Sequence, residues 1–147
     1  MQEFERNESP PAASVIIVNF NRVNLLAECL GSLARQSFQD FELIVVDNGS
    51  RDGSREWVAE HFPQAKVIAN ESNRGFCEAN NQGFAAARGK YFVLLNNDAV
   101  ADREWLGELV RRGEADPRCG MVASKVYGAG TERVIDKVGH LIYLDGQ

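Results

Sequence analysis

Three polar residues end an apolar run near the middle of the chain. The segment YFVLLNNDAV, residues 91–100, is apolar up to Leu95 and then presents Asn96, Asn97 and Asp98. Such runs usually end in a glycine or proline turn, but none follows here. One carboxylate flanked by amide oxygens suits a hard cation such as Mg²⁺ or Mn²⁺. Because one carboxylate is a sparse site, the cation would take further oxygens from a diphosphate and neutralise its charge as it departs.

Polar clusters of the same kind follow three other apolar runs. Asp47, after the second run, could accept hydrogen bonds from a base or a ribose. Arg74, after the third run, could offset the charge of a phosphate, and Gly75 opens a helix whose free N–H groups favour an anion. The clusters are Asn19-Phe20-Asn21-Arg22, then Asp47-Asn48-Gly49-Ser50 with Asp52-Gly53-Ser54, and Asn70-Glu71-Ser72-Asn73-Arg74-Gly75.

The same residue types also serve in turns and helix caps. Asn48-Gly49 and Asp52-Gly53 match ordinary turn chemistry, and residues 70–75 match a loop with a left-handed glycine. Asp98 or Asp102 could cap the helix that follows them. The sequence alone leaves both interpretations open for these clusters.

Hydrophobic periodicity predicts the elements that position the clusters. Apolar runs rich in β-branched residues alternate with segments whose apolar residues recur at helical spacing. The runs are continuous, which is typical of parallel strands covered on both faces. We therefore expect an α/β fold with an open, mostly parallel sheet, helices on both faces, and a ligand outside the carboxyl ends of the strands. The expected strands span residues 14–18, 42–46, 66–69, 91–95 and 121–126, and the expected helices span 25–33, 57–62, 76–87 and 105–110.

Length and composition bound the class of protein. The 147 residues are 44% hydrophobic and 25% charged, which fits one soluble domain with its own core. Residues 1–13 are polar and are expected to form a flexible lead-in, residues 14–147 the domain, and residues 131–144 a hairpin. The net charge is −5 without a basic stripe, which argues against a nucleic-acid partner. No signal peptide or apolar run of ~20 residues is present.

The cysteines and histidines indicate no catalytic or metal-binding role. Cys29, Cys77 and Cys119 lie far apart in apolar contexts, and no two have metal-ligand spacing. We expect buried or half-buried free thiols, as in a reducing cytoplasm. His61 is expected to be structural, and His140 to be structural or at the surface.

Several enzyme classes are disfavoured because their motifs are missing. The turn after the first strand has no glycine, unlike the G-x-G-x-x-G of dinucleotide oxidoreductases. P-loop and G-x-S-x-G nucleophile motifs are absent as well. A receiver domain would carry an acidic pair after its first strand, and a sugar nucleotidyltransferase would carry a Gly-rich, Arg-containing loop there. Phe20-Asn21-Arg22 supplies neither.

Five motifs, in order and at sensible spacing, resemble those of family 2 glycosyltransferases, and most of all the rhamnosyltransferase-like branch. The likeness covers the chain from about Ser14 onward. It implies a GT-A fold with a Rossmann-like nucleotide-binding half. The motifs are SVIIVNFNR at 14–22, VVDNGSRDGS at 45–54, NRGF at 73–76, ANNQG at 79–83 and LLNND at 94–98.

The resemblance implies metal-dependent, inverting transfer of a sugar from a nucleotide diphosphate sugar, with UDP- or dTDP-sugar as the expected donor. By motif, Asp98 matches the metal-binding aspartate, and Asp47 matches the acidic position beside the base. Asn48 and Asn97 stand where many members carry an acidic residue. The donor-binding set implied is Val18, Asn19, Asn21, Asp47, Asn48, Arg74, Gly75 and Asn97.

The resemblance also implies a class of acceptor, a cellular location and a further segment that carries the acceptor site. The acceptor would be a saccharide or lipid-linked glycan of a cell wall or surface polysaccharide, and the resemblance leaves room for peripheral association with the inner face of the cell membrane. Members usually continue for roughly 100 residues more, the scale of a larger domain, and that part carries the acceptor site and an acidic general base. We therefore expect a truncated chain, with its general base beyond Gln147. The alternative is a nucleotide-sugar binding module without transfer activity.

Overall fold

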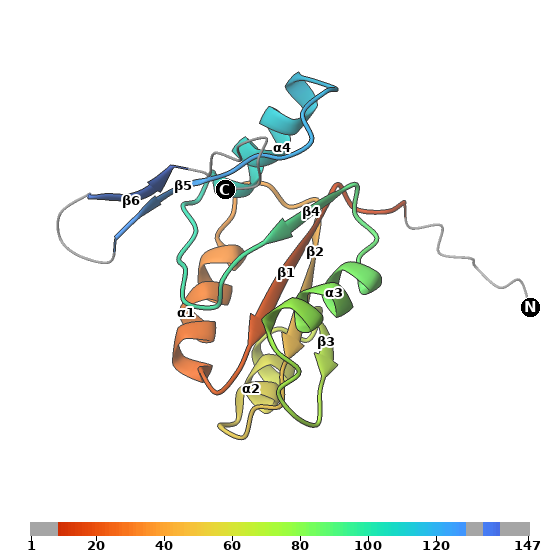
Figure 1. Cartoon of the computed structure of the whole chain (residues 1–147), viewed down its shortest axis with the longest axis vertical. Coiled ribbons are helices and arrows are strands. Elements are labelled where there is room, and N and C mark those ends of the chain that lie inside the picture. The colour runs from red at the N-terminus through yellow and green to blue at the C-terminus, as the bar shows by residue number, and fades with distance from the viewer. Residues whose placement is uncertain (1–8, 129–133, 139–147) are drawn as a thin grey trace, which may run out of the picture. The chain divides into compact units, whose positions relative to one another are not determined.

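The computed structural model describes residues 9–128 and 134–138. The chain divides into two compact units, one ending at Leu106 and the other beginning at Gly107 (Figure 1). The first unit contains all the polar clusters singled out above.

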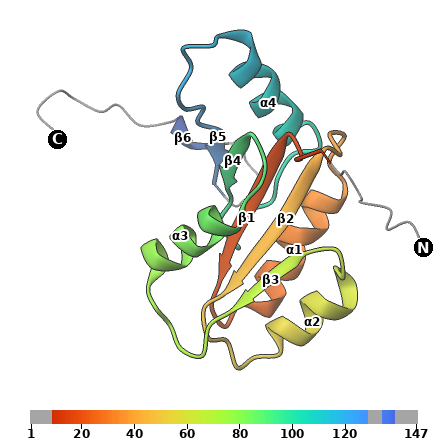
Figure 2. The same cartoon turned by 90° about the vertical axis from the view of Figure 1, so that its right-hand side faces the viewer.

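The first unit is built on a parallel sheet of four strands in the order β3-β2-β1-β4. Figure 2 shows α3 on one face of this sheet and α1 and α2 on the other. The predicted α/β fold, with a parallel sheet and helices on both faces, is therefore confirmed. The strands are β1 (Ala13–Asn19), β2 (Phe41–Asp47), β3 (Lys66–Ala69) and β4 (Tyr91–Leu94), and the helices are α1 (Val23–Ala34), α2 (Ser54–His61) and α3 (Phe76–Ala86).

The core lies on both faces of β1 and β2. Ile16, Ile44 and Val46 pack with Ala79 of α3 on one face. Their strand neighbours, which point the other way, are also buried, and so is the apolar stripe of α1 at Leu26, Cys29, Leu30 and Leu33. Double-sided burial explains why these two strands read as continuous apolar runs.

The outer strands are less covered than the sequence predicted. Phe92 and Leu94 of β4 are 54% and 49% exposed, and Val67 of β3 is exposed as well. Within the described residues, β3 and β4 each pair with one strand only. The expectation that every strand is covered on both faces was therefore wrong for these two.

The first strand begins slightly earlier than expected. The backbone carbonyls of Pro11 and Ala12 accept hydrogen bonds from the N–H groups of Lys90 and Tyr91, at 3.3 and 3.0 Å. Within the described part of the predicted lead-in, the chain is thus already bonded to the start of β4 before Ser14.

The predicted fifth strand of the parallel sheet was wrong. Helix α4 (Trp105–Ala115) follows the first four strands, and β5 (Lys125–Tyr127) pairs antiparallel with β6 (Ile135–Val138) in a separate two-stranded sheet. An antiparallel pair joins residues 125–127 to 135–138, and the rest of the hairpin expected over 131–144 lies outside the described residues. Short antiparallel strands need only a local turn, so this pair forms without joining the main sheet.

Two further expectations concern individual side chains. Cys29 is buried and Cys119 is half-buried, as expected, but Cys77 is exposed on α3, so that part of the prediction was wrong. The ring of His61 stacks on Trp57 at 4.5 Å between centroids, as suits a structural residue. His140 lies outside the described residues. No helix among the described residues is long and apolar enough to cross a membrane.

Gly83 allows α3 to lie directly on β1. A Cβ atom at this position would clash with Cγ2 of Ile16, well inside contact distance. Gly31 of α1 is different, because a Cβ there would meet only the end of the flexible Arg35 side chain, at 3.5 Å. The two glycines therefore form a matched pair for testing this packing.

We expect Gly83→Ala to destabilise the protein by about 1–3 kcal/mol, since overpacking displaces α3 or Ile16. Gly31→Ala should be neutral or stabilising by up to ~1 kcal/mol, because alanine is the better helix former. Urea unfolding followed by circular dichroism measures both changes. Equal effects of the two substitutions would contradict the close α3–β1 contact.

Candidate functional site

The loops that leave β1 and β2 are joined to each other. The backbone N–H of Asn21 donates to Oγ of Ser50 at 2.9 Å, and the N–H of Arg51 donates to Oδ1 of Asn21 at 2.8 Å. Asn21 has φ of 52°, a left-handed conformation that asparagine tolerates better than most residues. The side chain of Asn21 thus holds the second loop in place.

Asp52 caps two helices at once. Its Oδ2 accepts from the N–H of Val23 at the start of α1, and its Oδ1 accepts from the N–H and hydroxyl of Ser54 at the start of α2. Burial raises the pKa of Asp52, but the hydrogen bonds from Ser54 and Val23 outweigh it and hold the pKa below its usual range. Asp52 is therefore a capping residue, one of the two interpretations left open by the sequence.

Asp47 is buried at the end of β2, with only 1% of its surface exposed. Oδ1 accepts from Nε of Arg55 at 2.7 Å and from the N–H of Ser50 at 2.9 Å, and Oδ2 faces Nδ2 of Asn19 at 3.5 Å. Burial raises the pKa of Asp47, but the bonds from Ser50 and Arg55 overcome this and lower it. The carboxylate is thus charged and already engaged within the protein.

Asn48 uses its whole amide group to hold the loop after β3. Nδ2 donates to Oδ1 of Asn73 at 2.9 Å and to the carbonyl of Gly75 at 3.3 Å. Oδ1 accepts from Nδ2 of Asn70 at 3.1 Å and from the N–H of Arg74 at 3.0 Å. An aspartate could accept the last two bonds but could not donate the first two. The position therefore uses the donor capacity that only the amide has.

The segment after β4 is tied to β1 and α1. Nδ2 of Asn97 donates to Oδ1 of Asn19 at 2.8 Å, and the thiol of Cys29 donates to the carbonyl of Asn96 at 3.5 Å. Burial and then the charge of Asp98 raise the pKa of Cys29 to about 12, so this thiol stays protonated and can donate. These contacts place Asp98 at the edge of the sheet.

The chain after Asp98 is held by the end of α1. Nε2 of Gln36 donates to the carbonyl of Asp102 at 2.6 Å, and its Oε1 accepts from the N–H of Leu106 at 2.9 Å. Oδ1 of Asp102 accepts from the N–H of Glu104 at 3.1 Å. Asp102, and not Asp98, therefore bonds the backbone just before α4.

A cavity of about 370 Å³ opens where these loops meet at the carboxyl edge of the sheet. Four of the predicted donor-site residues line it: Val18, Asn48, Asn97 and Asp98. The other five residues that line it belong to the polar clusters or motifs but were not among the predicted donor-binding or metal-binding residues: Phe20, Arg22, Asn73, Phe76 and Asn96.

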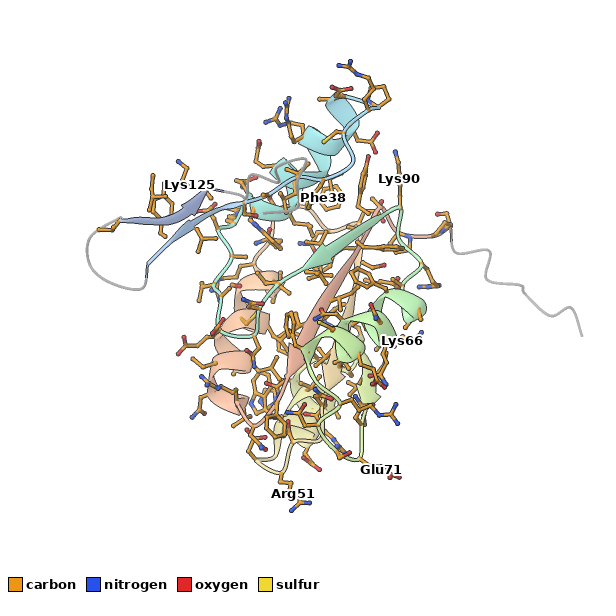
Figure 3. The ribbon with its side chains drawn as sticks, in the orientation of Figure 1. Phe38, Arg51, Lys66, Glu71, Lys90 and Lys125 are labelled. Carbon is orange, nitrogen blue, oxygen red and sulfur yellow. The ribbon has the colours of Figure 1, made fainter. Side chains whose placement is uncertain are left out.

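The remaining predicted residues lie elsewhere. Asn19 and Asp47 sit behind the loops, and Arg74 forms an ion pair with Glu78 at 2.8 Å. Gly75, with φ of 84°, lets the chain turn into α3. Asn21 lines a second cavity of about 300 Å³, together with Arg51 and Glu71, which lie on loops at this end of the sheet (Figure 3).

The residues missed by the sequence analysis carry a readable signal. Phe20 is 43% exposed within the first polar cluster, and Phe76, which directly follows the third cluster, is 58% exposed. Arg22 is the only charged residue in the first cluster. Phenylalanine is not a residue that turns favour. Its presence in or beside asparagine- and glycine-rich segments could therefore have indicated a role in ligand binding.

The oxygen ligands available for a cation are few. Within the described residues no three His, Cys, Asp or Glu side chains gather in one place. Asp98 is the one carboxylate that lines the cavity, beside the amides of Asn96 and Asn97. Such a set fits a hard cation only if a ligand such as a diphosphate supplies further oxygens.

Comparison with protein-family profiles matches residues 14–142 to the family described as Glycosyl transferase family 2. The chain belongs to this family. A glycosyltransferase of Haemophilus influenzae is 30% identical over 106 residues, which cover 70% of this chain and 33% of that protein.

Solved glycosyltransferase structures share the fold of this family 2 chain. TarS 1–349 of S. aureus in complex with UDP is 28% identical, with a TM-score of 0.66 over 70% of this chain and 32% of that one. The mannosyltransferase PcManGT of Pyrobaculum calidifontis, in complex with GDP-Man and Mn²⁺, is 29% identical, with a TM-score of 0.65 over 74% and 33%. The family 2 chain thus spans about a third of the length of the relatives that it matches.

We expect Arg55→Met to lower stability at neutral pH by about 1–3 kcal/mol, because it leaves the buried Asp47 carboxylate short of a charged donor. The Arg55 side chain is 35% exposed, so solvent screening favours the lower end of this range. The folded-state pKa of Asp47 is lowered, so its contribution is present above the unfolded value of about 3.9 and is lost as the pH falls through the folded value. The gap between variant and wild type should therefore close in acid.

Urea unfolding at a series of pH values measures this gap. Arg51→Met is the matched control, since no described residue forms an ion pair with Arg51. A difference between Arg55→Met and wild type that stays constant down to acid pH would mean that Arg55 acts through packing alone.

We expect Asn48→Asp to destabilise the protein at neutral pH by about 1–3 kcal/mol, because both donated bonds are lost and a carboxylate faces two oxygen acceptors. Those acceptors disfavour the charged form and raise the folded-state pKa of the introduced carboxyl. Stability should therefore recover as the pH falls and be lost as it rises through that pKa. Thermal melts across pH test this, with the exposed Asn81→Asp of α3 as control, and identical pH profiles for the two would contradict the amide network.

Proposed function

We propose that this chain is the donor-binding part of a metal-dependent glycosyltransferase, which binds a nucleotide diphosphate sugar in the cavity at the carboxyl edge of its sheet. The observation that carries the proposal is the position of Asp98, a lone carboxylate in the wall of a cavity lined by loops from β1, β2, β3 and β4. Ligands of open parallel sheets bind at this edge.

The side chains in this cavity fit an Mg²⁺ or Mn²⁺ ion shared with a diphosphate. Asp98 would hold the ion, and Asn97, which also lines the cavity, uses its Nδ2 to bond Asn19 and forms no hydrogen bond through its amide oxygen with any described residue. A bound cation would neutralise the charge that develops on the departing nucleoside diphosphate. The Mn²⁺ present with GDP-Man in PcManGT supports a divalent cation.

The protein's own residues would bind and orient the nucleotide. Phe20 and Phe76 offer aromatic faces in the cavity, and such faces stack readily on a planar base. Asp47 and Asn19 would act through the loops that they hold, because their polar atoms are engaged within the protein. Asn21, Arg74 and Gly75 would likewise shape the rim.

The donor, the acceptor and the stereochemistry follow from the motifs as proposals. We propose a UDP- or dTDP-sugar, inverting transfer, and a saccharide or lipid-linked acceptor, as in the rhamnosyltransferase-like branch. TarS has been solved with UDP and PcManGT with GDP-Man, so GDP belongs in any test of the base. A role in surface polysaccharide synthesis at the inner face of the cell membrane is part of the same proposal.

A second candidate is a nucleotide-sugar binding module without transfer activity. The residues that line the cavity include no acid besides Asp98 and no histidine, so none of them is placed to deprotonate an acceptor hydroxyl while Asp98 holds a cation. The chain also covers only a third of the relatives' length. Measuring sugar transfer by the whole chain separates the two candidates.

We expect Asp98→Asn to abolish the effect of Mn²⁺ on nucleoside diphosphate binding. Isothermal titration of wild type with UDP, dTDP and GDP should show binding that Mn²⁺ strengthens at least tenfold for one of them, and loss of a charged ligand should remove at least that much. Asp40→Asn, an exposed residue at the opposite end of β2, is the matched control. Binding that is metal-independent in wild type and unchanged in Asp98→Asn would falsify the role of Asp98.

A further inference from the structure

We propose that Arg22 is the residue that binds the phosphate groups of the ligand, and that Arg74, the arginine indicated by the sequence pattern, is not. This inference rests on the proposed function. Arg22 lies between β1 and α1 and lines the same cavity as Asp98. It is the only cationic side chain among the residues that line this cavity.

The arginines at this edge of the sheet differ in whether their guanidinium groups already form ion pairs within the protein. Nε of Arg55 is bound to Asp47 at 2.7 Å, and Nη1 of Arg74 is bound to Glu78 at 2.8 Å, one helical turn away. No described residue forms a hydrogen bond or an ion pair with the guanidinium of Arg22. Arg51 is unpaired in the same sense, but it lines the second cavity, which contains no Asp98.

The backbone around Arg22 is fixed although its side chain is not. Its carbonyl accepts from the N–H of Leu26 at 2.9 Å and so closes the first turn of α1. The next N–H, of Val23, donates to the carboxylate of Asp52 at 2.8 Å. The root of the side chain is therefore held at the rim while the guanidinium is exposed to the cavity.

The carboxylate of Asp52 also makes the start of α1 less attractive to a phosphate. A helix N-terminus attracts anions through its free N–H groups, but the first of these, the N–H of Val23, already bonds the negatively charged Asp52. The side chain of Arg22 is therefore the more favourable partner for an anion near this helix.

Charge balance gives Arg22 a specific task. Asp98 and the diphosphate of a nucleotide sugar together carry one more negative charge than a divalent cation neutralises. Arg22 supplies the missing positive charge within the same cavity. Its planar guanidinium can donate two parallel hydrogen bonds to phosphate oxygens, which lysine cannot do.

The test compares Arg22→Ala, Arg22→Lys and Arg74→Ala with wild type in titrations with UDP and with uridine, all with Mn²⁺. We expect Arg22→Ala to weaken UDP binding about tenfold or more, as for loss of a charge-assisted hydrogen bond. Uridine binding should be unchanged, because uridine has no phosphate. Arg22→Lys should recover only part of the loss, and Arg74→Ala should stay within about twofold of wild type. The dependence of UDP binding on salt should be shallower in Arg22→Ala alone.

The outcomes distinguish failure of the role of Arg22 from failure of the donor site itself. If wild type binds UDP and Arg22→Ala binds it equally well, the role of Arg22 is overturned while the donor site stands. If Arg74→Ala shows the larger loss, the sequence-based assignment is the correct one. If UDP, dTDP and GDP all fail to bind to wild type, the donor site itself is overturned, and the role of Arg22 with it. Thermal melts of the three variants test for loss of folding, which is not expected because Arg22 and Arg74 are both exposed.

Discussion

Asp47 and Asn48 lie side by side at the end of β2, and both are almost fully buried. A buried charge or amide is tolerated only when hydrogen bonds replace the water that it has lost. Here that requirement is met by drawing in the loops that follow β1, β2 and β3. Asp47 accepts hydrogen bonds from Ser50, Arg55 and Asn19, whereas Asn48 forms hydrogen bonds with the loop after β3. No buried side-chain nitrogen or oxygen in the described part of the chain lacks a partner.

This requirement divides the polar residues of the edge into two groups. The residues that satisfy one another set the positions of the loops, and their polar side-chain atoms are already bonded within the protein, even where a residue such as Asn48 also lines the cavity. The residues that remain outside, such as Arg22, Asp98 and the two exposed phenylalanines, are the ones available to a ligand. Asn19 joins the groups, since its amide touches both Asp47 and Asn97. A rigid inner layer that positions a small outer layer is the arrangement expected of a preorganised binding site.

The sheet imposes a second constraint, which is spacing. The cavity draws on loops from all four strands, from β3 to β4, a span of three interstrand distances or roughly 14 Å. The aromatic and amide side chains after β1, β2 and β3 and the carboxylate after β4 can therefore contact different parts of one extended ligand.

The sequence by itself determined the strands β1 to β4, the helices between them, and the edge at which the polar clusters meet. It could do so because hydrophobic periodicity is a local property, and because strands that alternate with helices predict parallel connections. It did not determine which polar residue faces a ligand: Asp47, Asn48 and Arg74 look as available as Asp98 when read along the chain, and Arg22 looks like an ordinary helix start. Only the tertiary structure decided this, because the hydrogen-bond partners of Asp47 and Asn48 come from loops up to 28 residues away. The same holds for β5, whose apolar run resembles a core strand but pairs antiparallel with β6 in a separate sheet.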